Sequence, residues 1–338
     1  MRVGVTGGAG FIGGYVCDEL LDRGHTPIIF DHRGRGLCQC NKALKYDHDI
    51  EVMLGDCRDE TAVTEFAARV DGIIHLASVL GTQETVQNPR PAVTTNIIAG
   101  MNVMEAATQY NLPVVNICVG NAGMANPYSA SKTCVESLGW MYVRDRGTRL
   151  NQVRVVNAYG PRQIPAAPYG PAKVRKIMPA FICRALTGNP IVVYGDGQQV
   201  SDCVYVHDVA VGLVNALELA SKDQILGKVA EVGPEDHTTV LYVAQEVAAR
   251  VQELTESEPV KITHAPMRPG ETPGARVVAD TSTLPLLGMK VEDLTPLREG
   301  VKLTVEWFAQ NWLPDWEAQT PSWLVEADRR RRPWRPLP

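Results

Sequence analysis

A glycine-rich turn between a strand and a helix constrains the fold of this chain more than any other feature. Residues 2–6 are short and rich in β-branched side chains, which predicts a buried strand. Gly7, Gly10 and Gly13 follow at once, and residues 15–23 then show the apolar periodicity of a helix. A strand, a glycine turn and a helix in this order are typical of dinucleotide-binding folds.

Each of the three glycines has a different expected role. Gly7 permits a tight turn, Gly10 lets the backbone approach a pyrophosphate, and Gly13 lets the helix pack closely on the strand. The first N–H groups of the helix would then face the phosphates. The spacing is Gly-x-x-Gly-x-x-Gly, not Gly-x-Gly-x-x-Gly, and a purely structural glycine turn is the alternative.

Strands and helices alternate over about the first 155 residues, which predicts a doubly wound parallel sheet. Ligands of such sheets bind beyond the carboxyl ends of the strands. Further strands are expected at residues 27–30, 50–54, 72–76, 113–118 and 153–156, and helices at 60–70, 91–110 and from Tyr128 onward.

Acidic residues follow two of these strands. Asp31 ends the second strand, where a carboxylate can accept hydrogen bonds from an adenosine ribose and disfavours a 2′-phosphate. NAD is therefore favoured, although Arg33 and Arg35 could instead receive the phosphate of NADP. Asp56 follows the third strand and could accept from an adenine amino group, whereas Asp59 is better placed to cap the next helix.

Tyr128 and Lys132 lie four residues apart at the start of the helix that follows the fifth strand. This spacing places both side chains on one face of the helix. A free tyrosine has a pKa near ~10, and a neighbouring ammonium lowers it by favouring the phenolate. The pair is therefore a candidate proton-transfer device, and its place on the binding edge of the sheet favours this over a chance spacing.

The second half of the chain has a mixed pattern. Helices are expected at residues 172–187, with Pro179 inside, and at 208–219 and 238–254. Strands are expected at 191–193 and near 229–232, outside the parallel sheet.

Several motifs occur in a fixed order from residue 1 to about residue 312. They are TGGAGFIG at 6–13, Asp31, Gly55-Asp56, His75-Leu76-Ala77, Asn96, Tyr128-x-x-x-Lys132, NAYGPR at 157–162, YGDG at 194–197, DCVYVHD at 202–208, RPGE at 268–271 and Ala279-Asp280. In this combination the chain resembles the extended short-chain dehydrogenase/reductase family. The nearest branch is the NAD-dependent sugar-nucleotide epimerases and dehydratases, such as the UDP-glucose 4-epimerases.

The resemblance implies an α/β fold with a Rossmann-type NAD-binding domain at residues 1–156. A smaller mixed α/β substrate-binding domain would occupy mainly 157–312, with segments crossing back, and 313–338 would be a C-terminal extension with a flexible tail. The implied cofactor-binding residues are Gly7, Gly10, Phe11, Ile12, Gly13, Asp31, Arg33, Asp56, Cys57, Leu76, Ala77, Ser78, Asn96, Tyr128 and Lys132. The implied substrate-binding residues are Thr82, Asn157, Arg162, Lys176, Arg268 and Glu271.

The resemblance also implies a mechanism. Tyr128, as phenolate, would take the proton of a sugar hydroxyl while Lys132 holds the phenolate. NAD would accept hydride from the same carbon, and an epimerase would turn the resulting keto-sugar and return the hydride to its other face.

The chain departs from the family pattern at two places, residues 120–122 and Ser201. The Ser or Thr that usually contacts the reacting hydroxyl falls on Gly120, and Asn121 or Thr82 could replace it. The Asp-Glu pair of the dehydratases is replaced by Asn121-Ala122, which argues against 4,6-dehydration. Ser201 stands where the family often has an arginine for the diphosphate. An NADPH-dependent reductase and a cofactor-binding protein with impaired catalysis therefore remain alternatives.

Composition excludes several other functions. The net charge of −5 argues against a nucleic-acid binder, and no apolar run is long enough to span a membrane. Scattered cysteines and a chain that starts with a strand predict a cytoplasmic protein without a signal peptide. Cys38 and Cys40, near His32 and His48, lack the usual spacing of a metal site, so no metal is expected. The resemblance implies a homodimer formed through residues 91–110 and 133–145.

Overall fold

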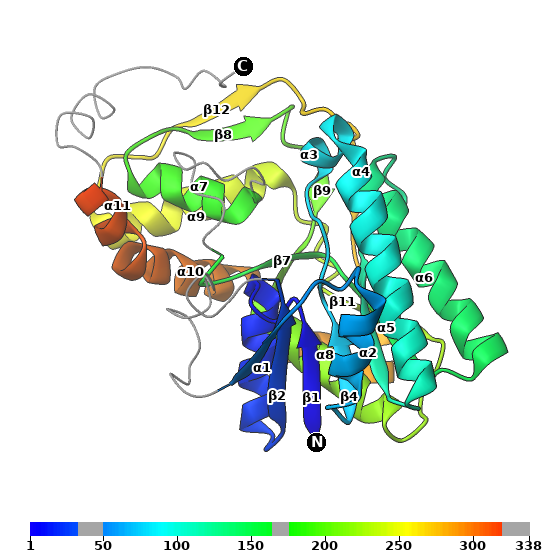
Figure 1. Ribbon diagram of the computed structural model, residues 1–338. Coiled ribbons are helices and arrows are strands. Elements are labelled where there is room, and N and C mark those ends of the chain that lie inside the picture. Colours follow the sequence, from blue (N-terminus) through cyan, green and yellow to red (C-terminus); the bar gives the residue numbers. More distant parts are fainter. Residues whose placement is uncertain (33–49, 164–175, 320–338) are drawn as a thin grey trace.

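The computed structural model describes residues 1–32, 50–163 and 176–319 of the 338-residue chain (Figure 1). Arg33 and Arg35, the Cys38/Cys40 segment with His48, and the arginine-rich C-terminus lie outside the described residues.

A parallel sheet forms the centre of the fold. Within the described residues it has seven strands in the order β11-β6-β5-β4-β1-β2-β3. The chain turns outward from β1 to β2 and β3, and then returns to place β4 on the other side of β1. Ligands bind at such switch points in open sheets, so the carboxyl ends of β1 and β4 define the expected site. The strands are β1 Arg2–Thr6, β2 Thr26–Asp31, β3 Glu51–Leu54, β4 Gly72–His75, β5 Val114–Val119, β6 Leu150–Val155 and β11 Val229–Val232.

Helices cover both faces of this sheet (Figure 1). On one face, α1 Phe11–Asp22 and α8 Val206–Ala220 pack over the apolar side chains of the central strands. On the other face, α2 Glu60–Ala67, α5 Ile98–Gln109 and α6 Pro127–Arg146 enclose a second apolar core. Because both faces are covered, the central strands are mainly apolar instead of alternating, as is usual in parallel sheets, although β6 carries Asn151, Gln152 and Arg154.

The long helix expected at residues 91–110 is not regular. A short helix, α4 Pro89–Ala92, leads into a π-helical turn, η2 Val93–Ile97, and only then into α5. The π turn holds the buried Asn96 side chain, which is hydrogen-bonded to Val79 and Ser131. Side-chain hydrogen bonds to neighbouring elements thus accompany a local widening of the helix, as is common at functional sites.

The expected strand near residues 229–232 does continue the parallel sheet, so the prediction that it lies outside was wrong. β11 pairs with β6 in parallel register, from Val229 opposite Gln152 to Val232 opposite Val155. β6 would otherwise be an exposed edge strand with unpaired backbone groups, which gives the physical reason for this pairing.

Part of the remaining chain forms a second layer beyond the carboxyl edge of the sheet, at the upper left of Figure 1, whereas α3 Thr82–Gln87 lies beside α4 and η4 Thr281–Leu287 packs on β11 and α8. The core of this layer lies between α7 Ile177–Leu186, α9 Val240–Thr255 and α10 Leu297–Asn311. The other short elements are β7 Asn157–Tyr159, β8 Ile191–Tyr194, β9 Val200–Ser201, β10 Cys203–Tyr205, β12 Ile262–Ala265, β13 Arg276–Val277, η5 Val291–Asp293 and α11 Leu313–Gln319.

Two details of this layer follow from local chemistry. α7 begins at Ile177, which places Pro179 in the first turn, where a missing backbone N–H breaks no helical hydrogen bond. Trp312 at the end of α10 stacks on Trp316 of α11 with ring centroids 5.9 Å apart, so α11 is held against the body of the protein.

Candidate active site

The glycine turn after β1 has the close backbone approaches that its sequence predicts. Gly7 has φ +69°, and a Cβ there would lie 2.8 Å from the backbone nitrogen of Ala77 at the end of β4. A Cβ on Gly13 would lie 2.6 Å from the carbonyl oxygen of Gly7. Gly10 is the N-cap of α1 and provides no side chain to accept from the first N–H groups of the helix. These groups and the helix dipole therefore suit a dinucleotide pyrophosphate.

Thr6 and His75 join the ends of β1 and β4. The Thr6 hydroxyl lies 2.7 Å from Nδ1 of His75. The same oxygen accepts from the backbone N–H groups of Leu76 and Ala77 at 3.2 and 3.3 Å. This arrangement fixes the backbone of Leu76, Ala77 and Ser78 beside the glycine turn, where the sequence places part of the cofactor site.

Asp31 is buried at the carboxyl end of β2, beside the glycine turn. One carboxylate oxygen accepts from the backbone N–H of Ala9 at 3.2 Å, and the other lies 3.2 Å from Nδ1 of His32. The carboxylate is thus held at the position where a ribose hydroxyl is expected, which suits NAD.

Asp56 lies at the outer end of the same edge. Its carboxylate forms a bidentate ion pair with Arg58, and this guanidinium lowers the pKa of Asp56. Cys57 is buried, and burial raises the pKa of its thiol to about 12. Asp59, as expected, caps α2 by accepting from the N–H of Ala62.

The helix that carries Tyr128 and Lys132 starts at a well-defined point. Asn126 is its N-cap, and the Asn126 side chain accepts from the N–H of Ser129 at 2.9 Å. Pro127 occupies the first position of the helix, where proline is favoured. The first turn of α6 therefore presents Tyr128, and the second presents Lys132, at the carboxyl edge of the sheet.

Burial decides the protonation of this pair. It raises the pKa of Tyr128 to about 12, and the nearby Cys118 adds to this effect. The expected lowering of the Tyr128 pKa is therefore wrong for the polypeptide, because burial of the phenol disfavours its charged form and Lys132 is not among the groups that shift this pKa. Burial also lowers the pKa of Lys132, while Cys118 and Glu136 act in the opposite direction.

Asn96 connects the two sides of the site. Its side chain accepts from the N–H of Val79 at 2.7 Å and donates to Ser131 Oγ at 2.9 Å. Ser131 in turn donates to the carbonyl oxygen of Tyr128 at 2.9 Å. The segment after β4 and the first turn of α6 are thereby held at a fixed separation.

The structure explains why no hydroxyl stands at position 120. A Cβ on Gly120 would lie 2.9 Å from both the carbonyl oxygen of Val155 and the Cα of Val156 in the neighbouring chain segment. Asn121 lies in the following turn, where its Oδ1 accepts from Ser129 Oγ at 3.2 Å and its Nδ2 lies 3.2 Å from the sulfur of Met124. Asn121 is thus next to the Tyr128 turn, and its amide supports that turn.

Four of the predicted substrate-binding residues lie close together, where α3, the start of α7 and the 268–271 loop meet. They are Thr82, Lys176, Arg268 and Glu271. Arg268 forms an ion pair with Glu271 and lies over the ring of Tyr194, 4.9 Å from its centroid. A Cβ on Gly270 would lie 3.4 Å from Thr82. Burial lowers the pKa of Lys176, with the charge of Arg268 adding to this effect and that of Glu84 opposing it.

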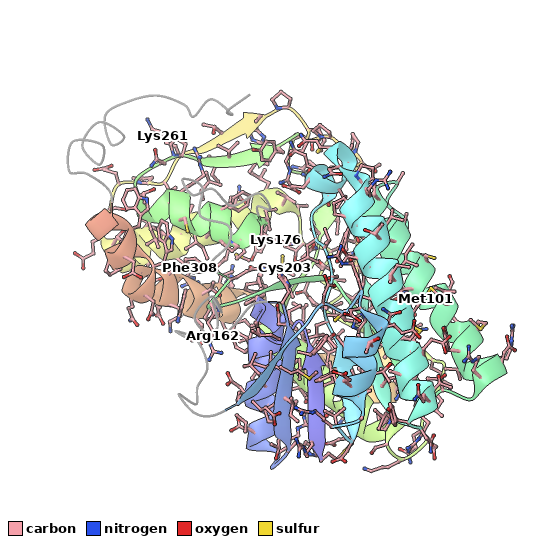
Figure 2. The ribbon with its side chains drawn as sticks, in the orientation of Figure 1. Met101, Arg162, Lys176, Cys203, Lys261 and Phe308 are labelled. Atoms are coloured by element: carbon pink, nitrogen blue, oxygen red, sulfur yellow. The ribbon has the colours of Figure 1, made fainter. Side chains whose placement is uncertain are left out.

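The other two predicted substrate residues have protein partners. Asn157 donates to Ser201 Oγ at 2.8 Å and to the carbonyl oxygen of Asp202 at 2.9 Å. Arg162 forms an ion pair with Asp18 of α1 at 2.8 Å and lies over the ring of Tyr15. Figure 2 shows Lys176 and Arg162 near the boundary between the sheet and the α7–α10 layer.

Sequence reasoning missed Glu84 beside Lys176 and the buried Glu136 beside Lys132. Glu136 had a detectable signal, because it follows Lys132 by four residues and so shares its helix face. Glu84 had none, since its proximity to Lys176 depends on two elements far apart in the chain.

The sequence matches the model of the NAD-dependent epimerase/dehydratase family over residues 3–233, which is more than half of the chain. The chain belongs to this family. Its cofactor is therefore NAD, and the glycine turn and Asp31 fit that cofactor. None of the described helices is long and apolar enough to cross a membrane.

Relatives of known name span almost the whole chain. The UDP-N-acetyl-alpha-D-glucosaminuronate decarboxylase of Bacillus cytotoxicus is 28% identical and covers 90% of this chain and 97% of its own length. The structure of UDP-glucose 4-epimerase from Thermotoga maritima with UDP-glucose has a TM-score of 0.77 and 27% identity, and covers 92% of this chain and 100% of its own. For UDP-glucose 4-epimerase of Thermus thermophilus in complex with NAD, the TM-score is 0.74 at 28% identity, with the same coverage of 92% and 100%.

Proposed function

We propose that this protein is an NAD-dependent nucleotide-sugar epimerase that acts through a transient keto-sugar. The observation that carries the proposal is the position of Tyr128 and Lys132, which open α6 after β5, with Lys132 close enough to His75 at the end of β4 to lower its pKa. The named relatives support a nucleoside-diphosphate sugar as the substrate class, and UDP-sugars are the first to test.

The residues of the chain would divide the work as follows. When bound, NAD supplies the acceptor and later the donor of a hydride. Tyr128 must act as a phenolate, whereas in the polypeptide alone burial keeps it a phenol; the positive charge of bound NAD and the ammonium of Lys132 would favour the phenolate. This phenolate takes the proton of the sugar hydroxyl as the C–H bond on the same carbon breaks, and the resulting phenol returns the proton when the carbonyl is reduced.

The substrate would lie between these two residues and the second layer. Arg268 and Lys176 are cations that lie where α3, α7 and the 268–271 loop meet. We propose that they bind the diphosphate of the substrate. Thr82 and Glu271 border the same place. Asn157 and Arg162, which have protein partners, would act by holding the loops around the substrate.

One observation supports a competing candidate, a cofactor-binding protein with impaired catalysis. Gly120 removes a hydroxyl that normally contacts the reacting group, and the loss of one such preorganised donor costs about 10²–10³ in rate. 4,6-Dehydration is not favoured, because Asn121-Ala122 stands where the dehydratases have the Asp-Glu pair that the resemblance assigns to this reaction. The third candidate, an NADPH-dependent reductase, depends on Arg33 and Arg35.

The test is direct observation of turnover. Purified protein is incubated with UDP-glucose, UDP-N-acetylglucosamine, UDP-glucuronic acid and representative GDP- and dTDP-sugars, and the products are followed by proton NMR. Epimerisation of at least one sugar, lost in Tyr128→Phe and kept in the matched control Tyr110→Phe, supports the proposal. Absence of any product together with tight NAD binding would instead support the impaired protein.

We also propose a homodimer formed through α5 and α6. These helices and the π turn before α5 carry exposed large apolar side chains: Val93 of η2 at 43%, Ile98 of α5 at 41% and Trp140 of α6 at 48%. α5 and α6 lie side by side on the side of the molecule away from α10 (Figure 1). A partner that covers these side chains would remove them from water.

A cytoplasmic location is proposed on the state of the cysteines. The six described cysteines are free thiols, which is typical of a reducing compartment.

A further inference from the structure

Lys132 is buried, with 3% of its surface exposed, and so is Glu136 one helical turn later, with 5% exposed. Side chains four residues apart lie on the same face of a helix. A buried ammonium is disfavoured unless a negative charge lies near it. The part of the chain that the structure describes must therefore supply a counter-charge if Lys132 is to stay protonated.

The groups around Lys132 come from three elements. His75 on β4 is neutral, because burial and the charge of Lys132 lower its pKa to about 3. The buried thiol of Cys118 on β5 has its pKa raised, so it is protonated near neutral pH. Tyr128 is a phenol for the same reason. Among the described groups that act on Lys132, Glu136 is thus the carboxylate.

Glu136 is itself fixed from the other side. Arg154 of β6 donates to both carboxylate oxygens of Glu136, from Nη2 at 2.5 Å and from Nε at 2.9 Å. The third guanidinium nitrogen, Nη1, donates to Glu231 of β11 at 2.9 Å. Glu231 also accepts from the N–H of Asp280 at 2.9 Å. A row of alternating charges therefore runs from Lys132 to the edge of the sheet.

We propose that Glu136 is a positioning residue for the reaction: its carboxylate keeps the buried Lys132 charged, while Arg154 and Glu231 hold Glu136 in place. This inference rests on the proposed function for its catalytic meaning. Without Glu136, Arg154 keeps a carboxylate in Glu231, whereas no carboxylate is left among the described groups that act on Lys132.

The decisive measurement does not depend on turnover. The protein is labelled with ¹³C at lysine Cε, and the titration of Lys132 is followed by NMR, with its signal assigned from its loss in Lys132→Met. In Glu136→Gln, which keeps the shape of the side chain, the midpoint should fall by about one pH unit or more. Glu136→Asp keeps the charge, so its Lys132 midpoint should lie close to that of the wild type. If the glutamine variant does not fold, the midpoint of the aspartate variant is measured in its place.

Glu231→Gln is the matched control. It removes the other carboxylate of Arg154, and should reduce stability without moving the Lys132 midpoint. An unchanged midpoint in Glu136→Gln, or an equal shift in Glu231→Gln, would overturn the proposal.

Steady-state kinetics provide a second test of the proposal. For the sugar that the wild type epimerises, Glu136→Gln should lower kcat about tenfold or more with little change in KM, and move the alkaline limb of the kcat profile down by about one pH unit. If the wild type turns over no sugar, the proposed function fails, while the NMR titration still decides the role of Glu136.

Discussion

The hydroxyl of Thr6 bridges His75 and the backbone of the next two residues, at the point where β1 and β4 end side by side. Because Thr6 Oγ1 accepts from the N–H groups of Leu76 and Ala77, its own proton is available to Nδ1 of His75 at 2.7 Å. When the hydroxyl donates this proton, Nδ1 is the acceptor and the ring is neutral, in agreement with the lowered pKa of His75. Protonation of His75 would reverse the direction of this hydrogen bond and place a buried charge at the ends of β1 and β4.

The first prediction concerns acid stability. The pKa of His75 is lowered to about 3 in the fold, against about 6.5 in the unfolded chain. Between these values the unfolded state binds more protons, so the free energy of unfolding falls as pH drops from about 6.5 towards 3. At pH 5 the loss from this group is about 2 kcal/mol. Urea unfolding of His75→Gln should show a shallower pH dependence than wild type, while His264→Gln, at an exposed site, should match wild type.

The second prediction concerns the proton-transfer group. Tyr128→Phe removes the oxygen that exchanges the proton but keeps the ring that fills the site. We expect kcat to fall about 10²–10⁴-fold, with NAD affinity close to wild type. Turnover assays and calorimetric NAD titration check both parts. A variant that retains most of its activity would show that another group handles the proton.

Asp31 leads to a third prediction, on cofactor choice. Asp31→Asn keeps an oxygen that can accept from the Ala9 N–H but removes the negative charge. The repulsion of a 2′-phosphate should then weaken, so the preference for NAD over NADP should fall by about tenfold or more. Dissociation constants for both cofactors, measured for wild type and variant, give the ratio. No change in that ratio would place the discrimination elsewhere.

The fourth prediction concerns Gly120. Gly120→Ser would bring back the hydroxyl of the family pattern, but its Cβ would collide with the backbone at Val155 and Val156. We expect the free energy of unfolding to decrease by about 1–3 kcal/mol and the turnover rate not to rise. Gly123→Ser is the control, because a Cβ there meets no atom within 4 Å. A serine variant that is both stable and faster would refute the steric explanation.

A fifth prediction concerns assembly. Trp140→Glu places a charge in the exposed apolar side of α6 and should convert the proposed dimer to a monomer. Light scattering after size-exclusion chromatography measures the mass. Leu303→Glu, at an exposed position of α10, should leave the mass unchanged. A wild-type protein that is monomeric at micromolar concentration would rule out this interface.

Much of the fold follows from local patterns. The glycine turn, the alternation of strands with helices and the Tyr128–Lys132 spacing are set by neighbouring residues, so each is visible in the sequence. The cap of α2 by Asp59 was likewise predictable, since it depends on the next three residues. The family motifs extended this to the cofactor and the class of reaction.

What could not be predicted depends on contacts between distant segments. The π turn is accompanied by hydrogen bonds from Asn96 to Val79 and Ser131, which belong to other elements. The place of β11 depends on an open edge at β6. The raised pKa of Tyr128 depends on how far the phenol is buried and on Cys118 of β5, and neither can be read from the spacing of Tyr128 and Lys132.

The pairing of β11 with β6 also has a consequence for synthesis on the ribosome. The first 156 residues contain six strands of the central sheet, but α8 covers one of its faces and β11 closes one of its edges. A nascent chain that ends before residue 206 therefore exposes an apolar face and unpaired backbone groups, both of which favour aggregation. The nucleotide-binding half is thus completed by the half that follows it, and a fragment cut between the two should need a chaperone to remain in solution.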